Sequence, residues 1–176
     1  MRFRETALAG VLVVQPEPVR DERGLFARTW DRQLFAARGL ETALAQCSVS
    51  FNRRRGTLRG MHFQAAPHGE AKLVRCTAGG VYDVVIDLRA GSPTRGRWHA
   101  VELTAENRYG LYVPPGCAHG FLTLVGNTEV FYQISEFYHP EASRGVRWDD
   151  PAFAVVWPER PAVLSERDAT YPDYAG

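Results

Sequence analysis

The stretch at residues 109–138 reads YGLYVPPGCAHGFLTLVGNTEVFYQISEFY. It contains three short runs rich in aromatic and β-branched residues, Tyr109–Val113, Gly120–Val125 and Glu129–Tyr138. The turn signals Pro114-Pro115-Gly116 and Gly126-Asn127 separate these runs. Aromatic and β-branched residues favour strands, whereas Gly, Pro and Asn favour turns. The stretch therefore predicts three consecutive short strands, and it sets the fold class for the rest of the chain.

The same pattern extends toward the N-terminus. Gly10–Val14 is a short apolar run, Lys72–Cys76 alternates between polar and apolar residues, and Gly80–Leu88 is rich in β-branched residues. Short strands with turn signals about every 8 to 12 residues indicate a β-sandwich or barrel. Such spacing leaves no room for the helical crossovers of a parallel nucleotide-binding sheet. We therefore expect an all-β fold of the barrel or sandwich type.

Two segments depart from this pattern. Trp30–Gly39 predicts the only helix of any length, with Trp30, Leu34 and Ala37 on its apolar face. The segment from residue 148 onward holds four prolines. Prolines at that density indicate an irregular arm that packs on the barrel.

Composition narrows the class of protein. A hydrophobic content of 45% suits a globular core, and we expect a single domain over residues 1–176. Lys and Arg number 21 against 20 for Asp and Glu. The chain therefore lacks the large net positive charge that attracts nucleic acid or an anionic membrane surface. No apolar run approaches the roughly 18 residues that cross a bilayer. The three widely spaced cysteines form no disulfide framework and predict a reducing, cytoplasmic compartment.

Two histidines lie in motifs that resemble those of the cupin family, whose fold is a jelly roll. Pro114–His119 fits the second cupin motif, Pro-x-Gly-x-x-His. His62-Phe63-Gln64 stands where the first cupin motif has His-x-His. The amide of Gln64 is a poor ligand for a transition metal, and His62 and His119 alone are too few for a tight site. We therefore expect the cupin fold without a bound metal.

His62 and four other residues have side chains suited to binding a sugar nucleotide and transferring protons. Arg59 precedes His62 by three residues, and Lys72 follows it by ten. Tyr132 and Asp168 lie farther along the chain. Guanidinium groups bind diphosphate oxygens, and His, Lys, Tyr and Asp are common proton carriers.

Several longer motifs resemble those of the dTDP-4-dehydrorhamnose 3,5-epimerase family, and their order and spacing match over almost the whole chain. They are Gly56–Gln64, Ala71–Cys76, Val81–Arg89, Pro114–Phe121, Trp148–Pro151 and Leu164–Asp168. The resemblance implies a cupin jelly roll that acts as a homodimer and needs no metal or cofactor. It also implies a dTDP-4-keto-6-deoxy sugar as substrate, epimerised at C3 and C5.

The resemblance assigns roles to individual residues. His62 matches the general base, and Asp168 matches the carboxylate that orients the imidazole. Tyr132 matches the acid that returns a proton to the opposite face of the sugar, and Lys72 matches the cation that stabilises the enolate oxygen. The residues that the resemblance and the sequence indicate for binding the sugar, diphosphate or base are Arg23, Arg28, Gln46, Ser48, Arg59, His119 and Tyr138.

Three positions differ from the family pattern, which has Glu at Arg28, Asn at Ser48 and Glu at Ser143. In the family these positions surround the nucleotide and sugar, so the differences bear on specificity more than on proton transfer. Four alternatives stay open from the sequence: a mono-epimerase acting at C3 or C5 only, a 3,4-ketoisomerase, a metal-dependent cupin enzyme, and a non-catalytic sugar-binding module.

Other titratable residues attract no functional prediction. His68 and His99 are expected to be exposed. Cys47, Cys76 and Cys117 are expected to be small core residues, because no neighbouring base would activate their thiols.

Overall fold

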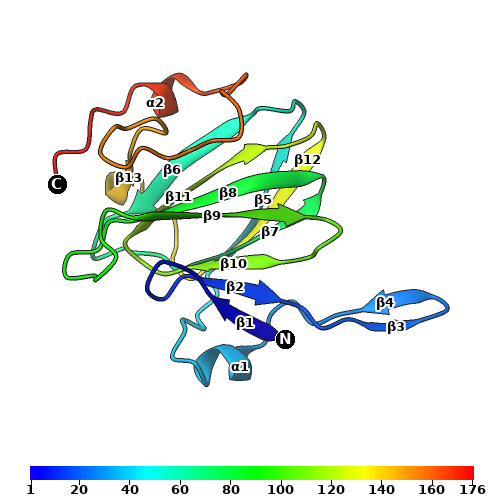
Figure 1. Ribbon diagram of the computed structural model, residues 1–176. Coiled ribbons are helices and arrows are strands. Elements are labelled where there is room, and N and C mark those ends of the chain that lie inside the picture. Colours follow the sequence, from blue (N-terminus) through cyan, green and yellow to red (C-terminus); the bar gives the residue numbers. More distant parts are fainter.

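The computed structural model describes residues 1–176 and consists of two antiparallel sheets that pack face to face (Figure 1). The larger sheet has six strands, in the spatial order β1 (Arg2–Glu5), β2 (Leu12–Gln15), β10 (Gly110–Val113), β7 (Lys72–Ala78), β12 (Thr128–Ile134) and β5 (Gln46–Asn52). The smaller sheet has five, in the order β13 (Ser143–Gly145), β6 (Leu58–Gln64), β11 (Cys117–Thr123), β8 (Gly80–Asp87) and β9 (Trp98–Thr104). The predicted all-β sandwich is therefore confirmed.

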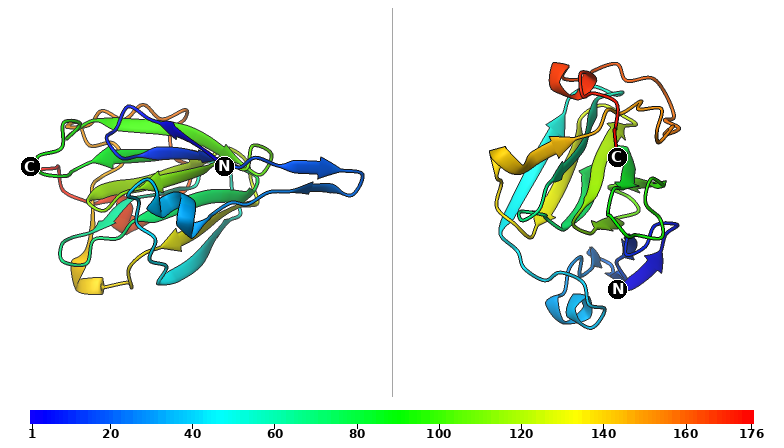
Figure 2. Two further views of the ribbon diagram at one scale, coloured as in Figure 1. Left: turned by 90° about the horizontal axis from the view of Figure 1, so that it is seen from below. Right: turned by 90° about the vertical axis from the view of Figure 1, so that its left-hand side faces the viewer.

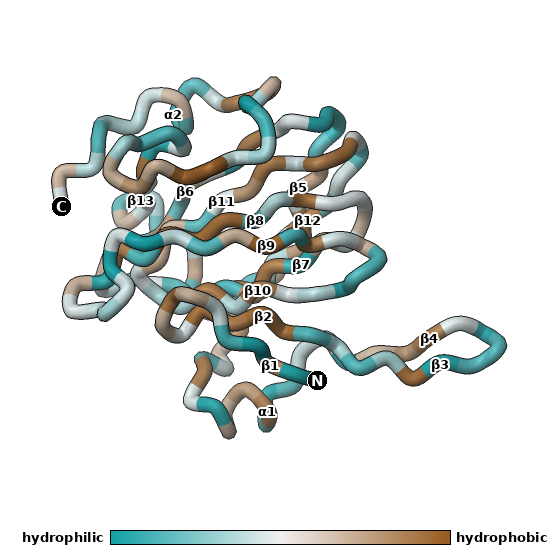
Figure 3. The backbone as a smooth tube through the Cα atoms, in the orientation of Figure 1, coloured by the Kyte–Doolittle hydropathy of each residue, from teal (hydrophilic) through white to brown (hydrophobic).

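Period-two alternation along the strands builds three apolar layers. In β7, Val74 and Cys76 face the core between the sheets, whereas Leu73 faces the outer side of the larger sheet. In β8, Val85 faces the inner core, whereas Val84 faces the outer side of the smaller sheet. Successive side chains of a strand point to opposite faces, so both faces of these strands are buried. Hydrophobic residues accordingly follow the strands in Figure 3.

The helix α1 (Arg32–Ala36) covers the outer side of the larger sheet, and it is shorter than predicted. It begins after Asp31, whose carboxylate accepts hydrogen bonds from the N–H groups of Gln33 and Leu34. Phe35 is its buried residue and packs edge-on against Tyr112. The predicted apolar face is therefore wrong at Leu34 and Ala37, because the short helix turns Phe35 toward the sheet.

The C-terminal arm covers the outer side of the smaller sheet and then passes the edge of β6 (Figure 1, orange to red). Phe153 belongs to the apolar cluster on that side. A parallel bridge joins Val163 to Thr57, and the N–H of Leu58 donates to the carbonyl of Val163 at 2.9 Å. The short helix α2 (Glu166–Ala169) follows, capped by Ser165. The arm is thus irregular, as predicted, but the main-chain hydrogen bond at Val163 fixes its position against β6 just before α2.

Two glycines let β6 and β11 approach closely. A Cβ on Gly60 would lie 2.5 Å from the Cα of Gly120, and Gly60 has a φ of +135°. The pairing of the two strands shifts register near this point. Just beyond it, His62 and His119 are direct cross-strand partners. The close approach therefore brings the two motif histidines side by side.

Buried hydrogen bonds fix the turn after β8. The carboxylate of Asp87 accepts from Arg89 at 2.9 and 2.7 Å, from Ser92 Oγ at 2.5 Å and from Thr94 Oγ1 at 2.6 Å. Burial alone would raise the pKa of Asp87, but these hydrogen bonds outweigh it and hold the pKa well below its usual range. Arg89 also donates to the carbonyl of Ala9 at 2.6 Å, which ties the turn to the N-terminal segment.

A hairpin of β3 (Val19–Asp21) and β4 (Gly24–Phe26) extends away from the sandwich (Figure 2). Its tip is hydrophilic (Figure 3). The remaining element is the single turn η1 (Pro140–Ala142), which follows β12. No helix has the length and apolar character needed to span a bilayer.

Three predictions about single residues are wrong. Cys47 is exposed, because it lies on the edge strand β5, whereas Cys76 and Cys117 are buried as predicted. His68 is partly buried, because its ring stacks on another histidine, and His99 is partly buried on β9. The predicted strand Glu129–Tyr138 is too long: β12 ends at Ile134.

Candidate active site

A cavity of about 630 Å³ lies beside the paired histidines. A second chamber of about 220 Å³ adjoins it and shares His62, Lys72, Ile134 and Arg167 with it. The lining of the main cavity comes from β5, β6, β7, β11, β12 and the C-terminal arm, so both sheets contribute. Its polar residues are Ser48, Ser50, Thr57, Arg59, His62, Lys72, His119, Tyr132, Ser165, Arg167 and Asp168.

His62 and Asp168 form the shortest polar contact of the cavity. Nε2 of His62 lies 2.7 Å from Oδ1 of Asp168, and the N–H of Gly60 donates to Oδ2 at 3.3 Å. Burial pushes the pKa of Asp168 upward, but its hydrogen bonds and the His62 charge outweigh burial and leave the pKa below its usual value. An ionised Asp168 accepts a hydrogen bond from Nε2–H, so Nδ1 of His62 carries the lone pair that can act as a base.

Tyr132 projects from β12 in the opposite sheet. Burial, followed by the nearby Asp83 carboxylate, raises the pKa of its phenol far above the usual value. The phenol therefore stays protonated and can donate a proton. Its ring meets that of His119 edge-on, with the centroids 6.1 Å apart.

His119 is held by a carboxylate that the sequence analysis missed. Asp83, fully buried on β8, lies 2.9 and 3.0 Å from Nε2 of His119 through its two oxygens. Burial raises the pKa of Asp83, and the His119 contact opposes that shift. An isolated Asp in a strand of β-branched residues was the available signal, because such a carboxylate is buried only with a partner.

Lys72 is the cation at the junction of the two chambers. Its Nζ lies 2.9 Å from Oε1 of Glu70 and donates to the carbonyl of His62 at 3.3 Å. The Glu70 side chain is 6% exposed, and its Oε2 is buried without a hydrogen-bond partner. Glu70 also lines the second chamber, and the sequence analysis did not single it out.

Two further polar residues support or line the walls. Asn52, buried at the end of β5, accepts a hydrogen bond from Nε of Arg59 at 2.8 Å and so fixes that guanidinium. Arg167 lines both chambers and donates to Oγ of Ser143 at 2.8 Å. Neither Asn52 nor Arg167 was predicted, although Arg167 directly precedes the predicted Asp168.

The structure brings together most of the predicted residues, but not all. Ser48 lines the main cavity, and Gln46 and Tyr138 line the second chamber. Arg23 lies at the turn of the β3–β4 hairpin, paired with Asp21 at 2.5 Å. Arg28 is exposed before α1 and pairs with Asp31. Neither arginine lines the cavity of its own chain.

The donor set of the cavity does not match a cupin metal centre. Nε2 of His62 is bound to Asp168, and Nε2 of His119 is bound to Asp83. The Gln64 amide donates to the main-chain carbonyls of His68 and Phe137, both at 3.0 Å. Each of these three groups is therefore already hydrogen-bonded to a different protein partner.

Known proteins resemble this chain over nearly its whole length. The family described as dTDP-4-dehydrorhamnose 3,5-epimerase matches residues 5–175. A dTDP-4-dehydrorhamnose 3,5-epimerase of Sinorhizobium fredii is 41% identical over 173 residues, which cover 98% of this chain and 89% of the relative.

Two solved structures have the same fold. The dTDP-4-dehydrorhamnose 3,5-epimerase of Bacillus anthracis, with TDP and PPi bound, is 36% identical with a TM-score of 0.94, covering 98% of this chain and 99% of that one. A 3'-monoepimerase of Streptomyces bikiniensis, in complex with dTDP-quinovose, is 33% identical with a TM-score of 0.88. The match covers 96% of this chain and 85% of that one. The chain is an isomerase with a cupin-like β-sandwich, and it belongs to the dTDP-4-dehydrorhamnose 3,5-epimerase family.

Proposed function

We propose that residues 1–176 form one epimerase domain that inverts C3 and C5 of a dTDP-4-keto-6-deoxyhexose. The observation that carries this proposal is the His62–Asp168 pair at 2.7 Å, in a cavity that also holds Lys72 and a protonated Tyr132 from the facing sheet. A base, a cation and an acid are the groups that inversion next to a ketone requires.

The first half-reaction removes a proton from the carbon beside the C4 ketone. Nδ1 of His62 takes this proton, and the electron pair of the broken C–H bond moves onto the C4 oxygen to give an enolate. Asp168 stabilises the resulting imidazolium, and Lys72 stabilises the enolate oxygen. Both effects grow as charge develops, so they lower the barrier rather than only tightening substrate binding.

The second half-reaction returns a proton to the other face of the same carbon. Tyr132 donates its phenolic proton to the enolate carbon, and the C4 ketone forms again. The phenolate then recovers a proton from solvent while His62 releases the one it took. Because C3 and C5 both lie beside C4, the same groups act on each carbon in turn.

The substrate's nucleotide is recognised by the remaining predicted residues. Arg59, fixed by Asn52, and His119, fixed by Asp83, bind the sugar and phosphate region. Gln46 and Ser48 on β5 contact the sugar and nucleotide, and Tyr138 stacks on the base. Planar guanidinium groups suit diphosphate oxygens because they donate two parallel hydrogen bonds.

The chain works as a homodimer in the cytoplasm. β5 is an edge strand with Val49 64% and Phe51 51% exposed, and an apolar open edge favours pairing with a second copy. Phe26 on the hairpin is 74% exposed. Arg23 and Arg28 can contact nucleotide only if the hairpin region reaches the cavity of the second copy. The free thiols of all three cysteines support a reducing compartment.

A second candidate is inversion of one carbon only. The likeness to the Streptomyces bikiniensis 3'-monoepimerase favours it, together with the sequence differences at Arg28, Ser48 and Ser143. The proton-transfer groups would be the same, and the second carbon would be positioned out of reach of His62.

Incubation with dTDP-4-keto-6-deoxyglucose in heavy water, followed by proton NMR, tests the proposal. Deuterium at both C3 and C5 is expected from the native chain, whereas deuterium at one of them indicates the mono-epimerase. His62→Asn should abolish exchange at both carbons while circular dichroism remains native. His99→Asn is the matched control on β9, and it should exchange normally. Native exchange by the His62 variant would contradict the proposal.

A further inference from the structure

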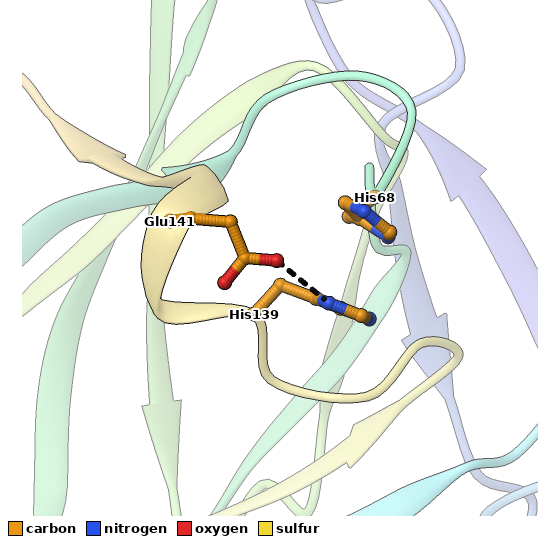
Figure 4. A group of neighbouring side chains, drawn as sticks. All are labelled: His68, His139 and Glu141. Carbon is orange, nitrogen blue, oxygen red and sulfur yellow. Dashed lines mark hydrogen bonds and ion pairs between the residues drawn. The ribbon is translucent and has the colours of Figure 1, made fainter.

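Three potential metal ligands gather outside the cavity. His68 lies in the loop between β6 and β7, and His139 and Glu141 lie at η1 (Figure 4). The two imidazole rings stack with their centroids 3.6 Å apart and their planes 17° apart. Oε1 of Glu141 lies 3.2 Å from Nδ1 of His139. One donor atom from each residue lies within 4.8 Å of the others, and none of the three lines either chamber of the active site.

A buried amide holds the two histidine-bearing segments together. Nε2 of Gln64 donates to the carbonyl of His68 at 3.0 Å, and Oε1 of Gln64 accepts from the N–H of His139 at 2.6 Å. Gln64 is 6% exposed, so water competes little for these hydrogen bonds. The main chains of both histidines are therefore fixed to one side chain. Fixing these main chains in advance lowers the entropy lost on binding, although the ligand side chains must still close on the ion.

We propose that His68, His139 and Glu141 form a binding site for one zinc-class divalent ion, distinct from the epimerase cavity. Two imidazoles and one carboxylate are a common zinc ligand set, with bonds of about 2.0–2.2 Å to nitrogen and oxygen. Calcium and magnesium prefer sites made of oxygen ligands alone, so the two imidazoles select against them. Water would complete the coordination.

The ligands have the freedom to close on an ion. Donors around a tetrahedral zinc lie about 3.3 Å apart, so the present span of 4.8 Å must shrink. The Glu141 side chain is 70% exposed and can rotate. The His139 ring, 29% exposed, must turn out of its stack with His68, because the lone pairs of two parallel rings do not point at one ion. Arg144 donates to the main-chain carbonyl of Glu141 and not to its carboxylate, so the ion would have to displace only the hydrogen bond between that carboxylate and Nδ1 of His139. Glu136, 3.9 Å from Nε2 of His139, adds negative charge.

A bound ion would connect two segments that border the active site. His68 precedes Glu70 in the loop before β7, and His139 follows Tyr138 after β12. Glu70, Glu136 and Tyr138 all line the second chamber. The ion would therefore stiffen the wall of that chamber without touching the proton-transfer groups.

Isothermal titration calorimetry of the whole chain with zinc chloride tests the proposed site. The native chain should bind one zinc ion, and zinc should raise its melting temperature. Glu141→Gln should weaken binding by about tenfold or more, and His68→Gln combined with His139→Gln should abolish it. Glu22→Gln, an exposed carboxylate on the hairpin, and His99→Gln are the matched controls and should bind as the native chain does.

Three outcomes would overturn the proposal. The first is no binding to the native chain up to about 1 mM zinc. The second is unchanged binding by both the Glu141→Gln variant and the double histidine variant, which would place the ion elsewhere. His62→Asn separates the two sites: zinc binding that survives this variant supports the surface site, and binding that disappears assigns the ion to the active-site histidine instead. Circular dichroism of Glu141→Gln, whose side chain is exposed, excludes misfolding as the cause of a loss.

Discussion

Nε2 of His62 lies 2.7 Å from Oδ1 of Asp168, although the two residues are 106 positions apart in the chain. The imidazole comes from β6 in the smaller sheet, and the carboxylate comes from α2 in the C-terminal arm. The carboxylate accepts from one ring nitrogen, so the other nitrogen carries the lone pair that faces the substrate. The position of the arm therefore sets the tautomer of the proposed base.

Asp168→Asn tests this relationship. An amide in the same place can donate to Nε2 and so favours the opposite tautomer, which leaves His62 without its basic nitrogen. We expect kcat to fall by about 10²–10⁴-fold with a smaller change in KM. Steady-state kinetics with circular dichroism measures both. Glu166→Gln, an exposed carboxylate in the same short helix, is the control and should retain native kcat.

Tyr132→Phe separates proton removal from inversion. The variant keeps His62, Asp168 and Lys72, so the substrate carbon should still lose its proton and exchange with heavy water. Without the phenol, protonation from the opposite face slows, and product formation should fall more than exchange does. NMR follows both rates in one experiment. Tyr82→Phe, on the outer side of the smaller sheet, is the control. An equal loss of exchange and inversion in Tyr132→Phe would refute a separate acid.

Glu70→Gln tests whether the buried carboxylate positions Lys72. The variant keeps the shape of the side chain but removes the charge 2.9 Å from Nζ of Lys72. A less restrained ammonium group stabilises the enolate less well, so kcat should fall by about tenfold or more while KM changes less. Glu136→Gln changes a more exposed carboxylate of the same chamber. Equal effects of the two variants would argue for a general electrostatic role of the chamber instead.

Asp87→Asn tests the turn after β8. The variant leaves the Arg89 guanidinium, which is 25% exposed, without its ionised partner, and the loss of such charge-assisted hydrogen bonds costs about 1.5–3 kcal/mol of unfolding free energy. The melting temperature should therefore fall, while the cavity residues stay in place. Asp149→Asn is the control, because it changes an exposed carboxylate that pairs with Arg147.

The same residue predicts a pH dependence of stability. The folded pKa of Asp87 is depressed below its ordinary value of 3.8, so its contribution is complete above that value and is lost as the pH falls toward the folded pKa. The difference in unfolding free energy between the native chain and Asp87→Asn should be constant near neutral pH and should shrink below about pH 4. Urea titrations at several pH values measure it, and a difference that grows on acidification would contradict the assignment.

Sequence patterns predicted the central strands better than the edges. β7, β8, β10, β11 and β12 carry dense apolar or β-branched residues, because both of their faces are covered. The strands β1, β5 and β9 lie at sheet edges, where side chains reach solvent. Polar residues such as Ser48 and Ser50 are tolerated there, so the pattern of alternating polar and apolar residues is harder to recognise. The predicted helix, Trp30–Gly39, is longer than the observed helix, Arg32–Ala36. Its predicted apolar face also omits Phe35, the residue that is buried.

The sequence predicted several residues that line the cavity, but not the residues that support them. His62, Lys72 and Asp168 stand in motifs, and all three line the cavity together with the predicted Tyr132. Asp83 and Asn52 act through contacts between strands, and such contacts depend on register and burial rather than on neighbours in the chain. Glu70 lies only two residues before Lys72, but its burial could not be predicted from the loop sequence. Arg23 shows the opposite case: its motif predicts nucleotide binding, yet the hairpin carries it away from the cavity of its own chain.

The docking of the arm through Val163 and Thr57 has a consequence for how the protein gains and loses its activity. The sandwich buries its inner core without any contribution from α2, whereas the base acquires its partner only when the arm has settled against β6. We therefore expect the His62–Asp168 pair to form only after the arm has docked on the folded sandwich. On gradual unfolding, activity should also be the first property to vanish, while the spectroscopic signature of the sheets persists.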